Sequence, residues 1–376
     1  MKIVRKARVF NAEEQNESAK AAFFDSLLKL SSGDWICGFT AGKTKHHHQA
    51  SVRLARSIDN GRSWSGIPWR FASTLGEIPG SLVGAEMVEI HPGRLLIFST
   101  WFDRSEPDRP LFDPETEGIL RSKQLMAASD DGGVSWSDWR AVSTPELTGC
   151  AVTGPVQKWR DGAIAFAFES FKEFDDPAPA RHAAWLLVSR DGGETFESPV
   201  LVARDPAGKK YFWDQRLCPG PIDGDYIAMF WTHDRSKARD LNVHFLWGNI
   251  AEVEPPLPAE TSIPGQIAAP LLLADGRILA FVVDRSRPGT MRLWASNDRG
   301  RTWPESDSIV VHDHEERAQV SQGSENVDFA EYWEDMGKWS FGHPSVRSLD
   351  TSDVLVTWYA GAPNCMSIHA AVVNID

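Results

Sequence analysis

The chain has 376 residues, of which 42% are hydrophobic and 24% charged, a balance that supports a folded core and excludes global disorder. Its formal net charge of −13 argues against a general nucleic-acid-binding surface, which needs clustered positive charge. The four cysteines, Cys37, Cys150, Cys218 and Cys365, are far apart, so neither a disulfide framework nor a zinc knuckle is expected.

The first segment, residues 3–10, alternates between apolar and polar residues like a β-strand. It contains no long apolar run and no small-residue cleavage site, so it does not read as a signal peptide. No later stretch approaches membrane-spanning length. We therefore expect a cytoplasmic protein with no membrane partner, although a secreted form whose leader had been removed would look the same.

Six strand–turn–strand openings follow along the chain. In each, a short apolar run precedes a tight turn rich in Gly, Pro, Ser or Asp, which is the pattern of a β-hairpin. In chain order, the runs cover residues 26–30, 87–90, 156–159, a weaker one around 217–230, 271–273 and 346–349.

A second repeat, Ser-x-Asp-x-Gly-x-(Ser/Thr)-aromatic, occurs four times, each time after an apolar strand. The copies are residues 57–64, 129–136, 189–196 and 296–303. The Asp can accept hydrogen bonds from backbone groups ahead of it, and the Gly supplies a positive φ, so each copy predicts a structural turn. The spacings are 72, 60 and 107 residues, and the last is nearly twice a unit. The unit between the third and fourth copies therefore lacks this turn.

Units of this length that repeat a hairpin are typical of propeller blades. We expect one all-β domain over residues 1–376, a six-bladed β-propeller of four-stranded antiparallel blades. The last unit has only three good strands, so the N-terminal strand at residues 3–10 is expected to supply its fourth and close the ring.

Repeats of this kind are called Asp-boxes. With four of them, the chain resembles the sialidase (neuraminidase) superfamily over nearly its whole length. The resemblance implies an arginine triad, an Asp acid/base, and a Tyr nucleophile paired with Glu. Where the family has its first Arg, its Asp and its Glu, this chain has residues 23–26, 49–51 and 153–155, respectively. The position of the family's Tyr maps near His343. Only Arg285 or Arg287 is a counterpart of a triad arginine. The resemblance thus implies the fold and carbohydrate chemistry, without standard sialidase activity.

Strand order places the long connections of such a propeller on one face, where sites are usually built. That face collects carboxylates, arginines, histidines and tryptophans, a mixture suited to a sugar ring and its hydroxyl or acidic groups. The candidate catalytic residues are Glu86, Asp25, His343 and His233. The candidate substrate-binding residues are Arg104, Asp103, Arg216, Asp214, Arg235, Arg285, Trp101 and Glu169.

The run His46-His47-His48 is the one sequence feature that could suggest a metal. Adjacent side chains in an extended segment point to alternate sides, so three in a row rarely bind one ion. We expect no metal and no cofactor, with at most one of these histidines facing a ligand.

Three functions remain open at this point. The first is a glycoside hydrolase acting on an acidic or other glycan, which needs two carboxylates of different pKa. The second is a lyase acting on a uronate-containing glycan, with His343 or Tyr211 as base. The third is a propeller that binds a glycan or a protein without catalysis. The sequence leaves the sugar, the linkage, the stereochemical outcome and the oligomeric state open.

Overall fold

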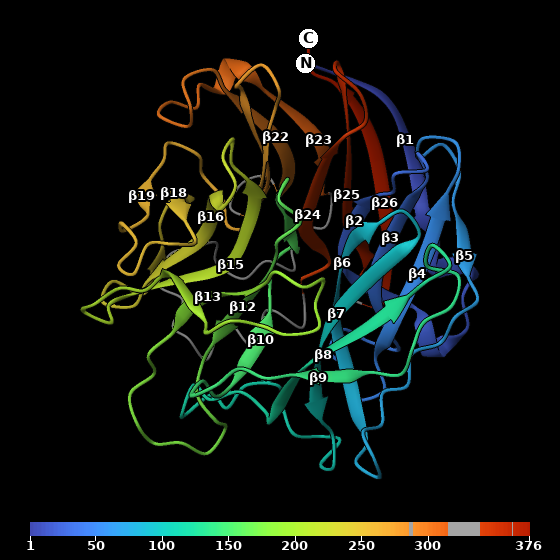
Figure 1. Cartoon of the computed structure of the whole chain (residues 1–376), viewed down its shortest axis with the longest axis vertical. Coiled ribbons are helices and arrows are strands. Elements are labelled where there is room, and N and C mark those ends of the chain that lie inside the picture. The colour runs from blue at the N-terminus through green and yellow to red at the C-terminus, as the bar shows by residue number, and fades with distance from the viewer. Residues whose placement is uncertain (286–288, 315–338, 363) are drawn as a thin grey trace.

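The computed structural model describes residues 1–285, 289–314, 339–362 and 364–376. Within these ranges the chain is all-β. It contains no α-helix, and three short 3-10 turns are present: η1 (Ala12–Glu14), η2 (Glu17–Ala19) and η3 (Glu305–Asp307). The sheets follow one another around the molecule in chain order, as the colour progression shows (Figure 1).

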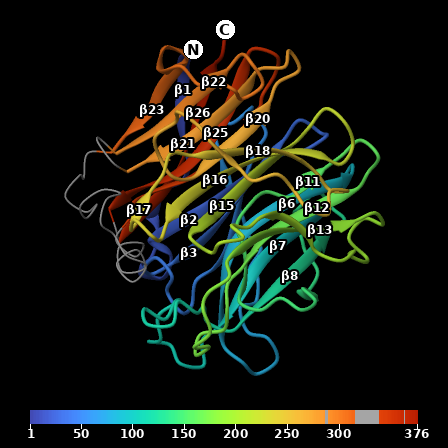
Figure 2. The same cartoon turned by 90° about the vertical axis from the view of Figure 1, so that its left-hand side faces the viewer.

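The largest sheet joins the two ends of the chain. Its strands are β24 (Phe341–Ser348), β25 (Asp353–Ala362), β26 (Cys365–Asn374), β1 (Lys2–Phe10), β2 (Ala21–Lys29), β3 (Trp35–Gly42), β4 (Ser51–Ser57) and β5 (Ser65–Ile67). Strand β1 pairs antiparallel with β26, from Lys2 opposite Asn374 to Phe10 opposite Ile368. Strand β2 meets β26 through one parallel bridge, Ala21 to Met366. Both views place the two termini together (Figure 1, Figure 2).

Four further antiparallel sheets complete the described fold. The first two contain β6 (Gly80–His91), β7 (Arg94–Asp103), β8 (Ser122–Ser129) and β9 (Arg140–Val142), then β10 (Cys150–Val152), β11 (Gln157–Lys158), β12 (Ile164–Ser170), β13 (Ala183–Ser189) and β14 (Val200–Ala203). The third contains β15 (Lys210–Pro219), β16 (Asp225–Asp234), β17 (Arg239–Asp240), β18 (His244–Asn249) and β19 (Ala259–Glu260). The fourth contains β20 (Ala268–Leu272), β21 (Ile278–Asp284), β22 (Thr290–Ser296) and β23 (Ser308–Asp313).

The four repeated turns lie between β4 and β5, β8 and β9, β13 and β14, and β22 and β23. They share one hydrogen-bond pattern. In the third copy the Ser189 hydroxyl donates to Asp191 (2.8 Å), and Asp191 also accepts bonds from the N–H and the hydroxyl of Thr195 (2.9 and 2.5 Å). The two Thr195 donors lower the pKa of Asp191 to about 2. The recurring Ser, Asp and Thr side chains of the repeat therefore stabilise turns.

Candidate functional site

Four strands, β2, β6, β15 and β24, carry the same irregularity. In each, the pairing with the next strand shifts across two unpaired residues. One residue inside each shift has a positive φ: Phe24 (52°), Gly84 (81°), Asp214 (48°) and His343 (56°). A bulge of this kind redirects a side chain, and positive φ is uncommon for residues other than Gly. All four residues line one cavity, so these bulges build the candidate site.

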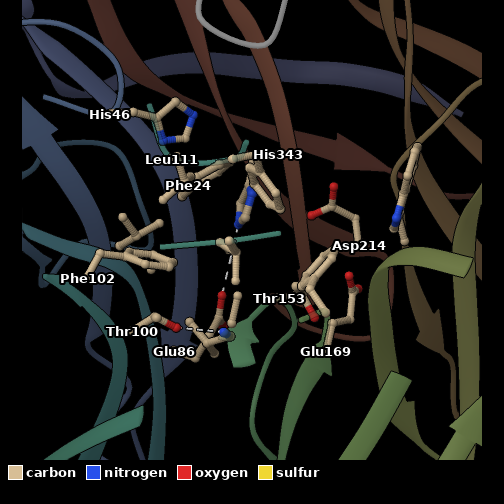
Figure 3. Close-up of a pocket in the computed structure, with 18 of the residues that line it drawn as sticks. Phe24, His46, Glu86, Thr100, Phe102, Leu111, Thr153, Glu169, Asp214 and His343 are labelled. Carbon is tan, nitrogen blue, oxygen red and sulfur yellow. Dashed lines mark hydrogen bonds and ion pairs between the residues drawn. The ribbon is translucent and has the colours of Figure 1, made fainter. Parts of the chain in front are cut away.

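The cavity has a volume of about 800 Å³, including its opening to solvent. Most of its lining is apolar. The aromatic side chains are Phe24, Phe102, Phe112, Phe171, Trp213 and Trp231. The aliphatic ones are Val83, Leu111, Ile119, Ala151 and Val152. The polar ones are three carboxylates (Glu86, Glu169, Asp214), two imidazoles (His46, His343) and two hydroxyls (Thr100, Thr153), most of which Figure 3 shows converging on the same space.

Arg216 connects two of these carboxylates from behind the cavity surface. Its Nη1 lies 3.7 Å from Oε1 of Glu86, and its Nη2 lies 4.0 Å from Oδ1 of Asp214. Arg216 and Glu86 are both almost completely buried, at 1% and 2% exposure. One buried guanidinium therefore lies within ion-pair distance of both carboxylates.

Burial raises the pKa of both carboxylates, and Asp214 also has a neighbouring carboxylate. Burial, together with the neighbouring Glu169 carboxylate, raises the pKa of Asp214 to about 6, and Arg216 opposes this rise. Burial also raises the pKa of Glu86, again against the effect of Arg216. Glu169 is itself held in place, since it accepts the Gln215 N–H (3.1 Å) and lies 3.0 Å from Nε2 of His182.

His343 contacts both Arg216 and Glu86. The Nη2 atom of Arg216 is 2.7 Å from Nδ1 and 2.8 Å from Nε2 of His343. Glu86 Oε1 lies 4.0 Å from Nε2 of His343 (Figure 3). Burial and the positive charge of Arg216 lower the pKa of His343 well below its usual range. At neutral pH the imidazole is therefore uncharged, which suits a proton acceptor or a hydroxyl ligand.

Asp25 does not line the cavity. The strand β2 bulge turns Phe24 toward the cavity and leaves Asp25 completely buried behind it. Burial raises the pKa of Asp25 to about 8, while the Thr357 hydroxyl and Arg216 oppose the rise.

We expect this buried acid to make stability depend on pH. Its folded pKa is about 8 against a reference value of 3.8, so above pH 3.8 the unfolded chain releases the proton first. Stability should therefore fall between pH 4 and pH 8. Asp25→Asn should raise the free energy of unfolding by about 1–3 kcal/mol at pH 8 and change it little at pH 4. Urea denaturation at both pH values checks this. A variant that loses stability equally at both would show that the carboxylate is needed in its charged form.

The structure separates the remaining candidate residues from the cavity surface. Trp101 is buried on the other face of β7, where its indole N–H donates to the Ser73 carbonyl (2.7 Å). Arg104 donates to the Ser81 hydroxyl (2.9 Å) and to the His46 carbonyl (3.3 Å), so it supports the loop that presents His46.

Asp103, His233 and Arg235 also lie outside the cavity lining. Asp103 accepts the Ser105 N–H (2.9 Å) within its own loop. His233 lies 3.1 Å from Asp240 and stacks on the outer side of Trp213 with ring centroids 5.3 Å apart. Arg235 donates to Glu117 (2.5 Å).

A cationic group that the sequence did not single out lies behind Phe24. Lys45 is buried, its Nζ donates to the Tyr359 hydroxyl (2.9 Å), and burial lowers the pKa of Lys45 well below its usual range. Arg285 lies close by, where it donates to the Phe341 carbonyl (2.7 Å) and stacks on Trp339 at 4.2 Å. Both cations also act on the pKa of Asp214. Arg287 lies outside the described residues.

The three consecutive histidines diverge. His46 lines the cavity, whereas the rings of His47 and His48 stack on each other at 4.2 Å. In the described ranges, no group of three His, Cys, Asp or Glu side chains is placed to hold a metal ion. No helix in those ranges is long and apolar enough to cross a membrane.

Sequence comparison and structural comparison give different results. No family model and no curated protein sequence matches the chain. Among solved structures, a protein of unknown function from Dyadobacter fermentans DSM 18053 superposes with a TM-score of 0.74 at 18% identity, covering 100% of this chain and 99% of that one. The Hadza microbial sialidase Hz136 gives 0.65 at 16% identity, covering 98% and 68%.

A third similar structure is an α-L-arabinanase of Penicillium chrysogenum complexed with arabinobiose. Its TM-score is 0.62 at 13% identity, and the match covers 99% of this chain and 98% of that one. The similarity that the Asp-box repeats predicted is therefore confirmed at the level of structure: the chain has the sialidase-like β-propeller fold.

Proposed function

We propose that the protein cleaves a glycosidic bond in this cavity, as a glycoside hydrolase other than a standard sialidase. The observation that carries the proposal is the pair Glu86 and Asp214, two carboxylates held by one buried guanidinium and exposed to the same cavity. Glycosidases use two carboxyl groups about 5–9.5 Å apart, one protonated and one ionised. The similarity in fold to a sialidase and an arabinanase supports the proposal that the ligand is a carbohydrate.

The two carboxyl groups take different roles. Asp214, with its pKa raised to about 6, is the group that can hold a proton for the leaving oxygen. Glu86, beside Arg216, is the second carboxylate, acting as nucleophile or as base toward water. Arg216 positions both, and Glu169 keeps the pKa of Asp214 high. Aromatic rings such as Trp213 and Phe102 offer faces for a sugar ring.

We further infer that the five sheets form a single domain of six four-stranded blades. The eight-stranded sheet divides into two such units at the single bridge between β2 and β26. Strand β1, paired with β26, then takes the fourth position of the last unit and closes the ring. This arrangement explains why the bulges of β2, β6, β15 and β24 face one cavity.

A panel of neutral, uronic and sialic aryl glycosides tests the hydrolase. Glu86→Gln is expected to lower turnover of the best substrate by about 10²-fold, because the second carboxylate is lost while the side-chain volume is kept. Glu89→Gln, on the same strand but outside the cavity lining, is the matched control and should retain activity. Binding without product, or equal rates for Glu86→Gln and the wild type, would favour a non-catalytic glycan-binding propeller.

The uncharged His343 favours a lyase as the second candidate. An imidazole with a lowered pKa beside Arg216 could remove a proton next to a uronate carboxylate, which the guanidinium would neutralise. Tyr211, the other candidate base, lies outside the cavity lining and donates to Glu117 (2.9 Å). Elimination creates a conjugated double bond and hydrolysis does not, so ultraviolet absorbance of the product distinguishes the two reactions.

A further inference from the structure

One wall of the cavity comes from the long connection between β7 and β8, residues 104–121. Three apolar side chains of this connection, Leu111, Phe112 and Ile119, line the cavity. Figure 3 shows Leu111 and Phe102 across from Asp214 and Glu169, with Glu86 on the same side as Phe102. Leu111 therefore faces two of the three carboxylates across the cavity.

The apolar wall is fixed to a neighbouring connection by its backbone. The Ile119 N–H donates to the Lys172 carbonyl (2.9 Å), and the Thr116 hydroxyl donates to the Phe174 carbonyl (2.5 Å). Ile119 also forms a parallel bridge with Glu173. These contacts hold the wall in place before any ligand arrives, which lowers the entropic cost of binding.

Glu117 clamps the same connection to the third of the smaller sheets. It has a φ of 64°, and its two carboxylate oxygens accept bonds from the Tyr211 hydroxyl (2.9 Å) and from Arg235 (2.5 Å). The Arg235 guanidinium also stacks on the Tyr211 ring at 4.8 Å. Arg235 and Tyr211, which the sequence offered as substrate-binding and basic residues, are used here to position the wall.

The charged side chains that line the cavity in the described part of the chain are all acidic. Glu86, Glu169 and Asp214 line the cavity, but within the described part of the chain no Lys or Arg does. Three cations close to the cavity in the described part of the chain are already engaged by protein groups: Arg216 by Glu86 and His343, Lys45 by Tyr359, and Arg285 by Gln266 and the Phe341 carbonyl. An acidic sugar would bring a further negative charge to a buried site that already contains three carboxyl groups.

We propose that the substrate is a neutral glycoside with an apolar leaving group, which packs against Leu111, Phe112 and Ile119. This inference rests on the proposed function and adds its substrate class. The sugar ring occupies the space between Glu86 and Asp214, where its hydroxyl groups can donate to both carboxylates. The leaving group packs against the wall of Leu111, Phe112 and Ile119, where burying an aromatic ring in place of a methyl group favours binding by about tenfold.

Calorimetric titration of the wild-type protein with non-hydrolysable thioglycosides tests this class directly. The panel pairs methyl with phenyl thioglycosides, and pairs each neutral hexose with its uronic acid, in both anomers. Phenyl compounds are expected to bind at least about tenfold more tightly than methyl compounds, and neutral sugars at least about tenfold more tightly than the matching uronic acids.

Two variants assign the preference to the wall. Leu111→Ala should remove most of the phenyl preference and leave the affinity for the methyl compounds unchanged. Leu257→Ala, an exposed leucine outside the cavity lining, is the control and should change neither affinity.

Equal or tighter binding of the uronic acids would overturn the proposal, and so would a phenyl preference that survives in Leu111→Ala. Failure of the whole neutral series to bind would overturn it as well. These outcomes concern binding alone. Tight, wall-dependent binding of neutral phenyl thioglycosides with no turnover of the corresponding aryl glycosides would instead refute the hydrolase and leave the ligand class standing.

Discussion

Asp214→Asn is expected to lower kcat/KM for an aryl glycoside by about 10²- to 10⁴-fold, because the amide has no acidic proton to give to the leaving oxygen. The substitution keeps the size of the side chain and removes one of three neighbouring negative charges, so the melting temperature should hold or rise. Asp103→Asn, an aspartate outside the cavity lining, is the control and should keep full activity. Steady-state kinetics and thermal denaturation of the purified variants provide both measurements.

The pH profile and the leaving group show which role Asp214 has. Its pKa is raised to about 6, so the carboxyl is protonated below that pH and loses its proton above it. The kcat/KM of the wild type should therefore fall as pH rises above about 6, and this limb should be missing in Asp214→Asn. Leaving groups of low pKa need little protonation, so the variant should lose least on them. A uniform loss for all leaving groups with an unchanged pH profile would mean that Asp214 only binds.

Short-range patterns in the sequence were enough to predict the strands and turns. The Ser, Asp and Gly of each Asp-box make their hydrogen bonds within a few residues, as Ser189 and Asp191 do, so a local pattern reports the local structure. The N-terminal alternation predicted β1, and the missing fourth strand of the last unit predicted its partner, which the pairing of β1 with β26 confirms. The expected number of blades and the closure of the ring stay proposals.

The bulge in β2 explains one difference between the expected and the observed site. Asp25 was expected in the cavity because it lies at the start of an inner strand, and Phe24 was not a candidate. The extra residue in β2 reverses this. On β7 the strand is regular, and Phe102 lines the cavity while Trp101 faces the other way. Nothing local in the sequence signals a positive φ at Phe24 or His343.

Other parts of the site depend on contacts between distant segments. Lys45 meets Tyr359, which is 314 residues away, and Arg216 meets Glu86 and His343 from two different strands. Residue types identified Glu86, Asp214, Glu169 and His343 as candidates, and the structure brings these four together in one cavity. One sequence could not predict which cation contacts these groups. It also could not predict which arginines only stabilise loops.

Arg216→Met is expected to lower the free energy of unfolding by about 3–5 kcal/mol at pH 8, since it leaves buried carboxylates without their cation. Arg216 opposes the rise in the pKa of both Glu86 and Asp214, so without it both pKa values rise further and the acids can bind protons instead. The loss should therefore be clearly smaller at pH 5 than at pH 8.

Urea denaturation at pH 5 and pH 8 measures this difference. Arg235→Met, which removes a guanidinium that is one-third exposed, is the control and should cost less than about 1 kcal/mol at either pH. Adding Glu86→Gln to Arg216→Met should recover part of the lost stability at pH 8, because one uncompensated charge is gone. If Arg216→Met loses the same stability at both pH values and Glu86→Gln recovers none of it, then Arg216 stabilises the fold by packing, and the electrostatic account of the two carboxylates fails with it.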